Sequence, residues 1–203
     1  MRILLASNNK GKLERYQNLL KQTNLNIELI TPDSLGILPI ETEEIGTSLR
    51  ENAELKARAY FGKTNLPILS NDTGFYVEGE GLIDTPKRMA LGKTHENTFT
   101  ESELYEKMIS FWKGIASKHG GKVDAAWVET FVLLYPDGSI KIADARREVT
   151  LTDQILGEAH INMPVRALYY SKATSKPAVT HTKEEELLEM KPIIGALKKL
   201  IGK

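Results

Sequence analysis

The chain has 203 residues, of which 41% are hydrophobic and 27% are charged, a composition typical of a globular protein large enough for one domain. Its 27 lysines and arginines balance 27 aspartates and glutamates, so the net charge favours neither a nucleic acid nor a membrane as partner. The lack of cysteine excludes disulfides, thiolate catalysis and cysteine metal sites. Because no apolar run is long enough for a signal peptide or a membrane span, we expect a single domain over residues 1–203 in the cytoplasm.

A strand, a polar turn and a helix open the chain. Ile3–Ala6 predicts the strand, and the spacing of Leu13, Tyr16 and Leu20 predicts the helix. This order directs backbone N–H groups and the positive end of a helix dipole at an anion. The turn has one glycine and no Ser or Thr after its last lysine, unlike the common nucleotide-binding loop, so a solvated turn is the alternative. It consists of Ser7, Asn8, Asn9, Lys10, Gly11 and Lys12.

Residues 48–62 predict an amphipathic helix that carries a cation and an amide. Ser48 with Glu51 three residues later indicates a capping box at its start. Asn52 and Lys56 are four residues apart and therefore lie on one face, where they could meet the same ligand as Lys12. The buried stripe is formed by Leu49, Ala53, Ala57 and Tyr60.

An apolar segment that runs into an acidic residue suggests the centre of the site. Ile68–Ser70 predicts a buried strand that ends at a polar corner over residues 71–74, and Phe75–Val77 predicts a return strand. Ligands bind at the carboxyl ends of strands in open α/β sheets, where Asp72 could hold a hard cation. The alternative is a turn aspartate that hydrogen-bonds its own backbone.

The remaining elements follow from periodicity and turn signals. Pro136-Asp137-Gly138 is a strong hairpin signal, Thr182 with Glu185 forms a second capping box, and Pro192 fits the first turn of a terminal helix. In chain order we expect a strand over 27–30, an acidic loop over 31–47, a long loop over 78–100, a helix over 101–118, strands over 125–135, 139–149 and 165–170, a helix from 182 through 188, and the terminal helix.

Three segments in this order resemble the inosine/xanthosine triphosphate pyrophosphatase family. The family's T-G-N-x-x-K opening corresponds to Ser7–Lys12, although the first two residues differ. Its E-N-A-x-x-K-A helix corresponds to Glu51–Ala57, where every motif position matches. Its A-D-D-S-G strand end corresponds to Ser70–Gly74. Each motif alone is modest, but their order, spacing and strand–helix context agree over the N-terminal part of the chain.

The resemblance implies an α/β fold, namely an elongated, twisted, mixed β-sheet flanked by helices, with two lobes and a nucleotide cleft between them. It also implies a homodimer and a Mg²⁺-dependent reaction that converts a nucleoside triphosphate to the monophosphate and pyrophosphate. Neither a nucleic acid nor a membrane is expected as partner.

The resemblance also implies roles for individual residues. Lys12 and Lys56 would clamp the triphosphate, while Asp72 would bind Mg²⁺ and orient or deprotonate the attacking water. Metal ligands would be Glu44, Asn71 and Asp72, with Asp72 also catalytic. Substrate-binding residues would be Ser7, Asn8, Asn9, Lys10, Gly11, Lys12, Asn52, Lys56, Thr73, His160 and Lys183.

The chain departs from the family pattern at four places. One is residues 83–88, where the family's glycine-proline-glycine segment ending in S-A-R is not recognisable. Asn71 replaces the first aspartate of A-D-D-S-G, and an amide supplies neither charge nor a base. Residues 160–164 replace the base-binding F-G-Y-D-P, and residues 190–193 occupy the region of the base-reading S-H-R; Arg166 and Lys191 are candidate replacements. We therefore expect an altered or relaxed base preference. A catalytically weakened protein that binds or senses a nucleotide is the alternative.

Overall fold

The computed structural model describes residues 1–42, 46–94 and 96–202. The chain forms two compact units, the first made of residues 1–73, 129–146 and 191–203 and the second of residues 74–128 and 147–190. Three strands contribute residues to both units, namely β3 (Ile68–Val77), β5 (Lys122–Leu134) and β6 (Ile140–Thr152). The two units are therefore connected by several passages of the chain.

Over the described residues the strands form one eight-stranded mixed sheet, in the order β2-β1-β3-β5-β6-β7-β8, with β4 paired to β3. β1 runs parallel to both β2 and β3, whereas β3–β4, β6–β7 and β7–β8 are antiparallel. The predicted mixed α/β sheet with flanking helices is confirmed. The remaining strands are β1 (Arg2–Leu5), β2 (Glu28–Ile30), β4 (Gly81–Ile83), β7 (Tyr169–Ser171) and β8 (Lys176–Pro177).

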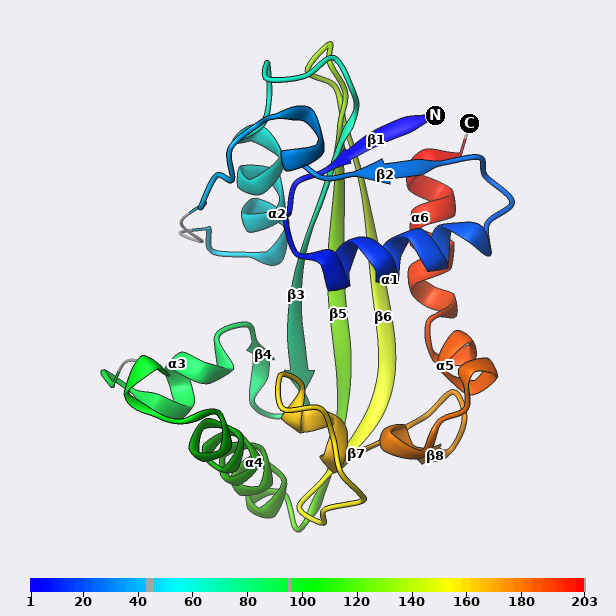
Figure 1. The fold of residues 1–203 in the computed structure, drawn as a ribbon. Helices are drawn as coiled ribbons and strands as arrows, with labels where there is room; N and C mark the ends of the chain where they lie inside the picture. Colours follow the sequence, from blue (N-terminus) through cyan, green and yellow to red (C-terminus); the bar gives the residue numbers. More distant parts are fainter. Residues whose placement is uncertain (43–45, 95, 203) are drawn as a thin grey trace. The chain divides into compact units, whose positions relative to one another are not determined.

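The first unit packs its helices around an aliphatic core. α1 (Lys10–Lys21) lies against β2 and beside the terminal helix α6 (Lys191–Ile201), as Figure 1 shows. α2 (Leu49–Arg58) buries the stripe that its spacing predicts, because Leu49, Ala53, Ala57 and Tyr60 are all at most 5% exposed. A short 3₁₀ turn, η1 (Asp33–Leu35), precedes α2.

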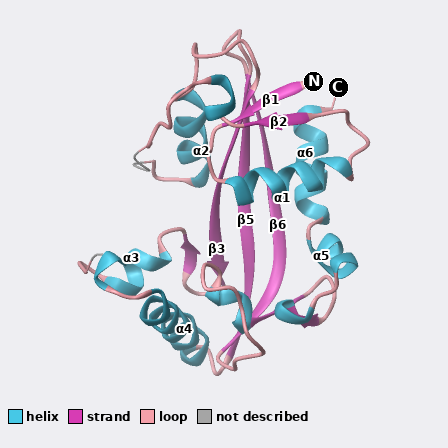
Figure 2. Ribbon diagram, viewed as in Figure 1, coloured by secondary structure: helices cyan, strands magenta, loops and turns pink. Residues whose placement is uncertain are grey.

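The second unit is built on an aromatic core. Phe75 packs edge-to-face against Trp112 and Trp127, with ring centroids 5.1 and 4.9 Å apart. Its helices α3 (Pro86–Leu91) and α4 (Glu101–Lys118) lie side by side (Figure 2). The other helical segments are η2 (Glu96–Thr98), η3 (Pro164–Leu168), η4 (Ala178–Thr180) and α5 (Lys183–Glu189). Among the described residues, no helix is both long and apolar enough to cross a membrane.

Predictions that depend on local signals are confirmed. α4 occupies the predicted residues 101–118. At the β5–β6 hairpin, Tyr135 N–H donates to Ser139 O at 2.9 Å, and Gly138 has a φ of +84° that favours glycine. Thr182 and Glu185 form the predicted capping box of α5, and α6 begins at Lys191 with Pro192 in its first turn.

Three predictions about element boundaries are wrong, the first two because strand pairing and helix packing override the turn and loop signals. The polar corner at residues 71–74 does not exist, since β3 continues through it. The stretch 78–100 is not one loop, because it contains β4 and α3. Residues 165–170 begin with the 3₁₀ helix η3, because Pro164 sets the φ of a first helical turn, and β7 starts only at Tyr169.

A buried ionic cluster holds α5 in the second unit. Arg147 Nη1 donates to Glu189 Oε1 at 2.8 Å, and their side chains are 6% and 1% exposed. Tyr169 OH donates to the same carboxylate at 3.3 Å, and His181 Nδ1 lies 3.2 Å from its other oxygen. A buried carboxylate needs such partners because it has lost its hydration.

We predict that Glu189→Gln lowers the unfolding free energy by about 3 to 5 kcal/mol, because it removes the buried charge that faces Arg147. Urea denaturation measures the change. Glu186→Gln on the same helix is the control: its carboxylate pairs with Arg166 at 2.6 Å but is 48% exposed, so its loss should cost no more than about 1 kcal/mol. Equal effects of the two variants would contradict the buried pair's importance.

We also predict an alkaline stability limit set by Tyr169. Burial, assisted by the Glu189 carboxylate, raises the pKa of Tyr169 from 10.0 to about 12. The unfolded state then loses this proton first, so stability is retained below about pH 10 and lost as the pH rises toward about 12. By pH 12 the wild type should lose roughly 2 kcal/mol more than Tyr169→Phe, measured by urea denaturation from pH 9 upward. Parallel curves for the two proteins would contradict the shift.

Candidate functional site

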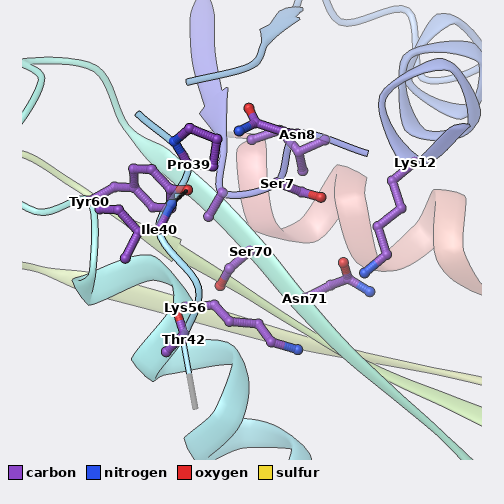
Figure 3. Close-up of a pocket in the computed structure, with 12 residues that line it drawn as sticks. Ser7, Asn8, Lys12, Pro39, Ile40, Thr42, Lys56, Tyr60, Ser70 and Asn71 are labelled. Carbon is purple, nitrogen blue, oxygen red and sulfur yellow. Dashed lines mark hydrogen bonds between the residues drawn. The ribbon is translucent and has the colours of Figure 1, made fainter. Parts of the chain in front are cut away.

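A cavity of about 280 Å³ opens in the first unit, where the β1–α1 turn, the segment before α2, α2 itself and β3 meet (Figure 3). The two lysines expected to clamp a polyphosphate both line it, one from α1 and one from α2. The lining residues are Leu5, Ala6, Ser7, Asn8, Lys12, Pro39, Ile40, Thr42, Lys56, Tyr60, Ser70 and Asn71.

The β1–α1 turn is held in shape by its own side chains. Asn9 is the N-cap of α1, and its Oδ1 accepts a hydrogen bond from Lys12 N–H at 3.0 Å. Ser7 Oγ accepts one from Asn9 N–H at 3.2 Å. Of the predicted residues in this turn, Ser7, Asn8 and Lys12 line the cavity, while Asn9 has a structural role through its oxygen.

The acidic centre of the site is an ion pair between α2 and β3. Lys56 Nζ lies 2.7 Å from Asp72 Oδ1, and the two side chains are 18% and 9% exposed. Asn52 Nδ2 donates to the other carboxylate oxygen, Oδ2, at a longer 3.4 Å. Asn52 and Lys56 thus share a face of α2, as their spacing predicts, and both contact the Asp72 carboxylate.

Strand geometry separates Asn71 from Asp72. Successive side chains of a strand point to opposite faces, and Asp72 contacts α2 together with Ser70, whose Oγ donates to Ala53 O at 2.5 Å. Asn71 instead donates from Nδ2 to Thr73 Oγ1 at 3.1 Å. In Figure 3 the side chains of Lys12 and Lys56 extend toward Asn71. Because Asn71 and Asp72 diverge, this geometry does not favour the prediction that both bind one ion.

The cavity suits an anionic ligand. Two of its described lining residues, Lys12 and Lys56, are cationic, and none of them is a carboxylate. Asp72 offsets the charge of Lys56, so the described side chains around the cavity keep a positive balance. A partly buried cationic site of this kind attracts phosphate groups more strongly than an exposed one, because water screens it less.

The described residues of the site can hold a magnesium ion only together with the phosphate groups of a bound substrate. Mg²⁺ is commonly bound by one or two carboxylates together with substrate phosphates and water. Asp72 supplies one carboxylate, and the described residues contain no cluster of three or more acidic, His or Cys side chains that could hold an ion. The predicted ligand Glu44 lies outside the described residues. Asp72 is therefore the carboxylate that would hold the ion, with phosphate oxygens completing its shell.

The sequence interpretation missed one wall of the cavity. The acidic loop expected over residues 31–47 contributes Pro39, Ile40 and Thr42 to this wall. The sequence had placed Tyr60 in the buried stripe of a helix. Tyr60 is indeed buried, but its hydroxyl accepts a hydrogen bond from Ile40 N–H at 3.1 Å and so holds this wall against α2. A tyrosine at the end of an apolar helix stripe was the only local signal.

Four further residues were proposed to meet the base or a phosphate, and three of them belong to the second unit. His160 and Lys183 are exposed residues of the second unit, and their roles stay predictions. Arg166, also in the second unit, donates to Ala178 O at 2.9 Å and to Glu186 at 2.6 Å, so it has a structural role there. Lys191 is exposed at the start of α6.

The sheet, its flanking helices and the cavity lined by two lysines define an α/β protein with a cationic pocket. The chain belongs to the Ham1 family, whose model matches residues 3–162. This membership confirms the predicted resemblance, because the curated relatives matched below carry the name dITP/XTP pyrophosphatase.

Two relatives and one solved structure illustrate the similarity. The dITP/XTP pyrophosphatase of Corynebacterium efficiens is 32% identical over 159 residues, which cover 77% of this chain and 73% of the relative. That of Aquifex aeolicus is 37% identical over 78 residues, covering 38% of this chain and 36% of the relative. A HAM1 protein from Coxiella burnetii has the same fold, with a TM-score of 0.74 and 21% identity over 99% of this chain and 98% of the other.

Proposed function

We propose that this protein is a nucleoside-triphosphate pyrophosphohydrolase, which converts a (d)NTP and water to the (d)NMP and pyrophosphate. One observation carries the proposal: Lys12 and Lys56 line the same cavity, and Asp72 is bonded to Lys56 beside it. The names of the relatives support the same reaction class.

In the proposed reaction, the oxygen of a water molecule forms a bond to the α-phosphorus, and the bond from that phosphorus to the α–β bridging oxygen breaks. Pyrophosphate leaves, and the proton of the water passes to the Asp72 carboxylate or to solvent. Lys12 and Lys56 hold the phosphates in line and neutralise their charge, which is most of what phosphoryl chemistry asks of a protein. When Mg²⁺ is bound, it polarises the phosphate and lowers the pKa of bound water.

The proposal includes an altered or relaxed base preference, because residues 160–164 and 190–193 do not carry the motifs with which the resembled family reads a purine. It also includes a homodimer, as the resemblance implies, and the cytoplasmic location expected from the sequence. Light scattering of the purified protein tests whether it is a homodimer.

The reaction is tested with a panel of common and deaminated (d)NTPs and Mg²⁺, assayed for pyrophosphate. We predict turnover of nucleoside triphosphates with several different bases. In Lys12→Met we predict a loss of kcat/KM of at least 10-fold, because a phosphate-binding cation is removed. The loss should lie mainly in KM, since binding charge is lost.

Lys21→Met is the matched control, because Lys21 lies in the last turn of the same helix and is exposed. It should change kcat/KM less than about 2-fold. If every triphosphate is inert at high protein concentration, the enzyme proposal is overturned.

A second candidate function is a protein that binds or senses a nucleotide without efficient turnover. Asn71 favours it, because an amide at the cavity adds neither charge nor a base. The lysine pair and Asp72 favour the enzyme, since a binding site has no need of a carboxylate beside a polyanion.

An Asn71→Asp variant separates these two functions. For a slow enzyme we predict a rate increase of about 10-fold, because a carboxylate at the cavity could accept the proton of the attacking water, which an amide cannot. A nucleotide-binding protein should gain no measurable turnover. Pyrophosphate release measures the rate, and thermal-shift titration with nucleotide confirms that the variant still binds its ligand.

A further inference from the structure

Asn52 is a buried amide with both of its ends engaged. It is 4% exposed, its Oδ1 accepts a hydrogen bond from Gly46 N–H at 2.8 Å, and its Nδ2 faces Asp72 Oδ2 at 3.4 Å. The Gly46 N–H can only donate, so it determines which end of the amide is the oxygen. The remaining NH₂ group must therefore face the carboxylate.

The approach of Gly46 to α2 is too close for any other residue. A Cβ at position 46 would lie 2.6 Å from Asn52 Oδ1, 2.8 Å from Glu51 Cβ and 3.0 Å from Asn52 N. Two of these contacts involve Cβ or backbone atoms, which cannot swing away. The backbone at residue 46 thus packs directly against the amide, and the hydrogen bond from Gly46 N–H sets the orientation of the amide.

The two oxygens of Asp72 are held by different residues of one helix. Lys56 pairs with Oδ1 at 2.7 Å and supplies the opposite charge. The longer contact from the neutral Asn52 to Oδ2 serves to orient the carboxylate. Were a phosphate group to draw Lys56 away from Asp72, Asn52 would be the described donor of α2 that still contacts the carboxylate.

A second clamp holds the same segment without touching Asp72. Thr47 N–H and Oγ1 donate to Glu51 Oε2 at 2.6 and 2.8 Å, and Ser48 caps the helix by accepting from Glu51 N–H. The residues that enter α2 are therefore anchored twice, and only the Asn52 anchor reaches the carboxylate.

We propose that Asn52 is a positioning residue, which transmits the Gly46 backbone contact to Asp72 and fixes the carboxylate for the attack on the α-phosphate, and that it is not a direct ligand of the nucleotide. This inference rests on the proposed function and deepens it. It replaces the expectation that Asn52 binds substrate.

The test compares the wild-type protein, Asn52→Ala and the control Glu51→Gln, which loosens the second clamp only. For Asn52→Ala we expect kcat to fall at least 10-fold with KM within 3-fold of wild type, and the Mg²⁺ concentration for half-maximal rate to rise at least 3-fold. Glu51→Gln should leave all three values within 2-fold. Melting temperatures are recorded for every variant.

Three results would overturn the inference. If KM rises while kcat is unchanged, Asn52 contacts the substrate. If Asn52→Ala and Glu51→Gln lose activity equally, the effect is general loosening of the helix start. If the rate loss disappears at a temperature where both proteins are fully folded, the role is stability alone.

A second variant keeps the inference testable should Asn52→Ala fail to fold. Asn52→Asp retains an oxygen acceptor for Gly46 N–H but replaces the donor that faces Asp72 with an anionic oxygen. The segment should stay anchored while the carboxylate is displaced, so kcat should fall at least as far as in Asn52→Ala. A wild-type rate in Asn52→Asp would overturn the proposal.

Direct Mn²⁺ binding separates this inference from the proposed reaction. Titration of the nucleotide-free protein, followed by electron paramagnetic resonance, should give at least 3-fold weaker Mn²⁺ binding in Asn52→Ala than in wild type or Glu51→Gln. If no triphosphate is hydrolysed but this difference is found, the reaction is wrong and the positioning role stands. If hydrolysis occurs but the variants bind Mn²⁺ and turn over alike, only the positioning role fails.

Discussion

The site depends on one ion pair, between Lys56 on α2 and Asp72 on β3. The Asp72 side chain is 9% exposed, and a carboxylate so far removed from water is stable only with a counter-charge and hydrogen-bond donors. Lys56 supplies the first and Asn52 adds a donor. The pair therefore ties the helix to the strand and orients the Asp72 carboxylate at the same time.

This pairing also explains how a strand can carry a polar sequence through its middle. Ser70, Asn71 and Asp72 are each at most 7% exposed, and each finds a partner: the Ala53 carbonyl, the Thr73 hydroxyl and the Lys56 ammonium. With their polar groups satisfied, the residues remain in the extended backbone of β3. The alternation of that backbone then sends Asp72 to α2 and Asn71 to the other face.

The cavity combines walls held by local hydrogen bonds with charges at the ends of long side chains. Asn9 caps α1, Ser48 caps α2, and the Tyr60 hydroxyl fixes the Ile40 backbone, so the walls are set by local hydrogen bonds. The charges, in contrast, sit at the ends of lysine side chains, which can follow a polyphosphate as it changes shape. Fixed walls and adjustable cations suit phosphoryl chemistry, where positioning and neutralisation supply most of the rate.

Local signals in the sequence were enough to predict α4, the β5–β6 turn, the caps of α2 and α5, and the shared face of Asn52 and Lys56. The resemblance of three motifs to a known family grouped Lys12, Lys56 and Asp72 in one predicted site. The structure places Lys12 and Lys56 in one cavity and pairs Asp72 with Lys56. Only the tertiary structure decided that β3 continues through Asn71–Gly74, that Tyr60 and Ile40 form a wall, and that Asn52 faces Asp72. Those outcomes depend on partners distant in sequence, such as Ala53 for Ser70, and no local pattern records which partner satisfies a buried polar group.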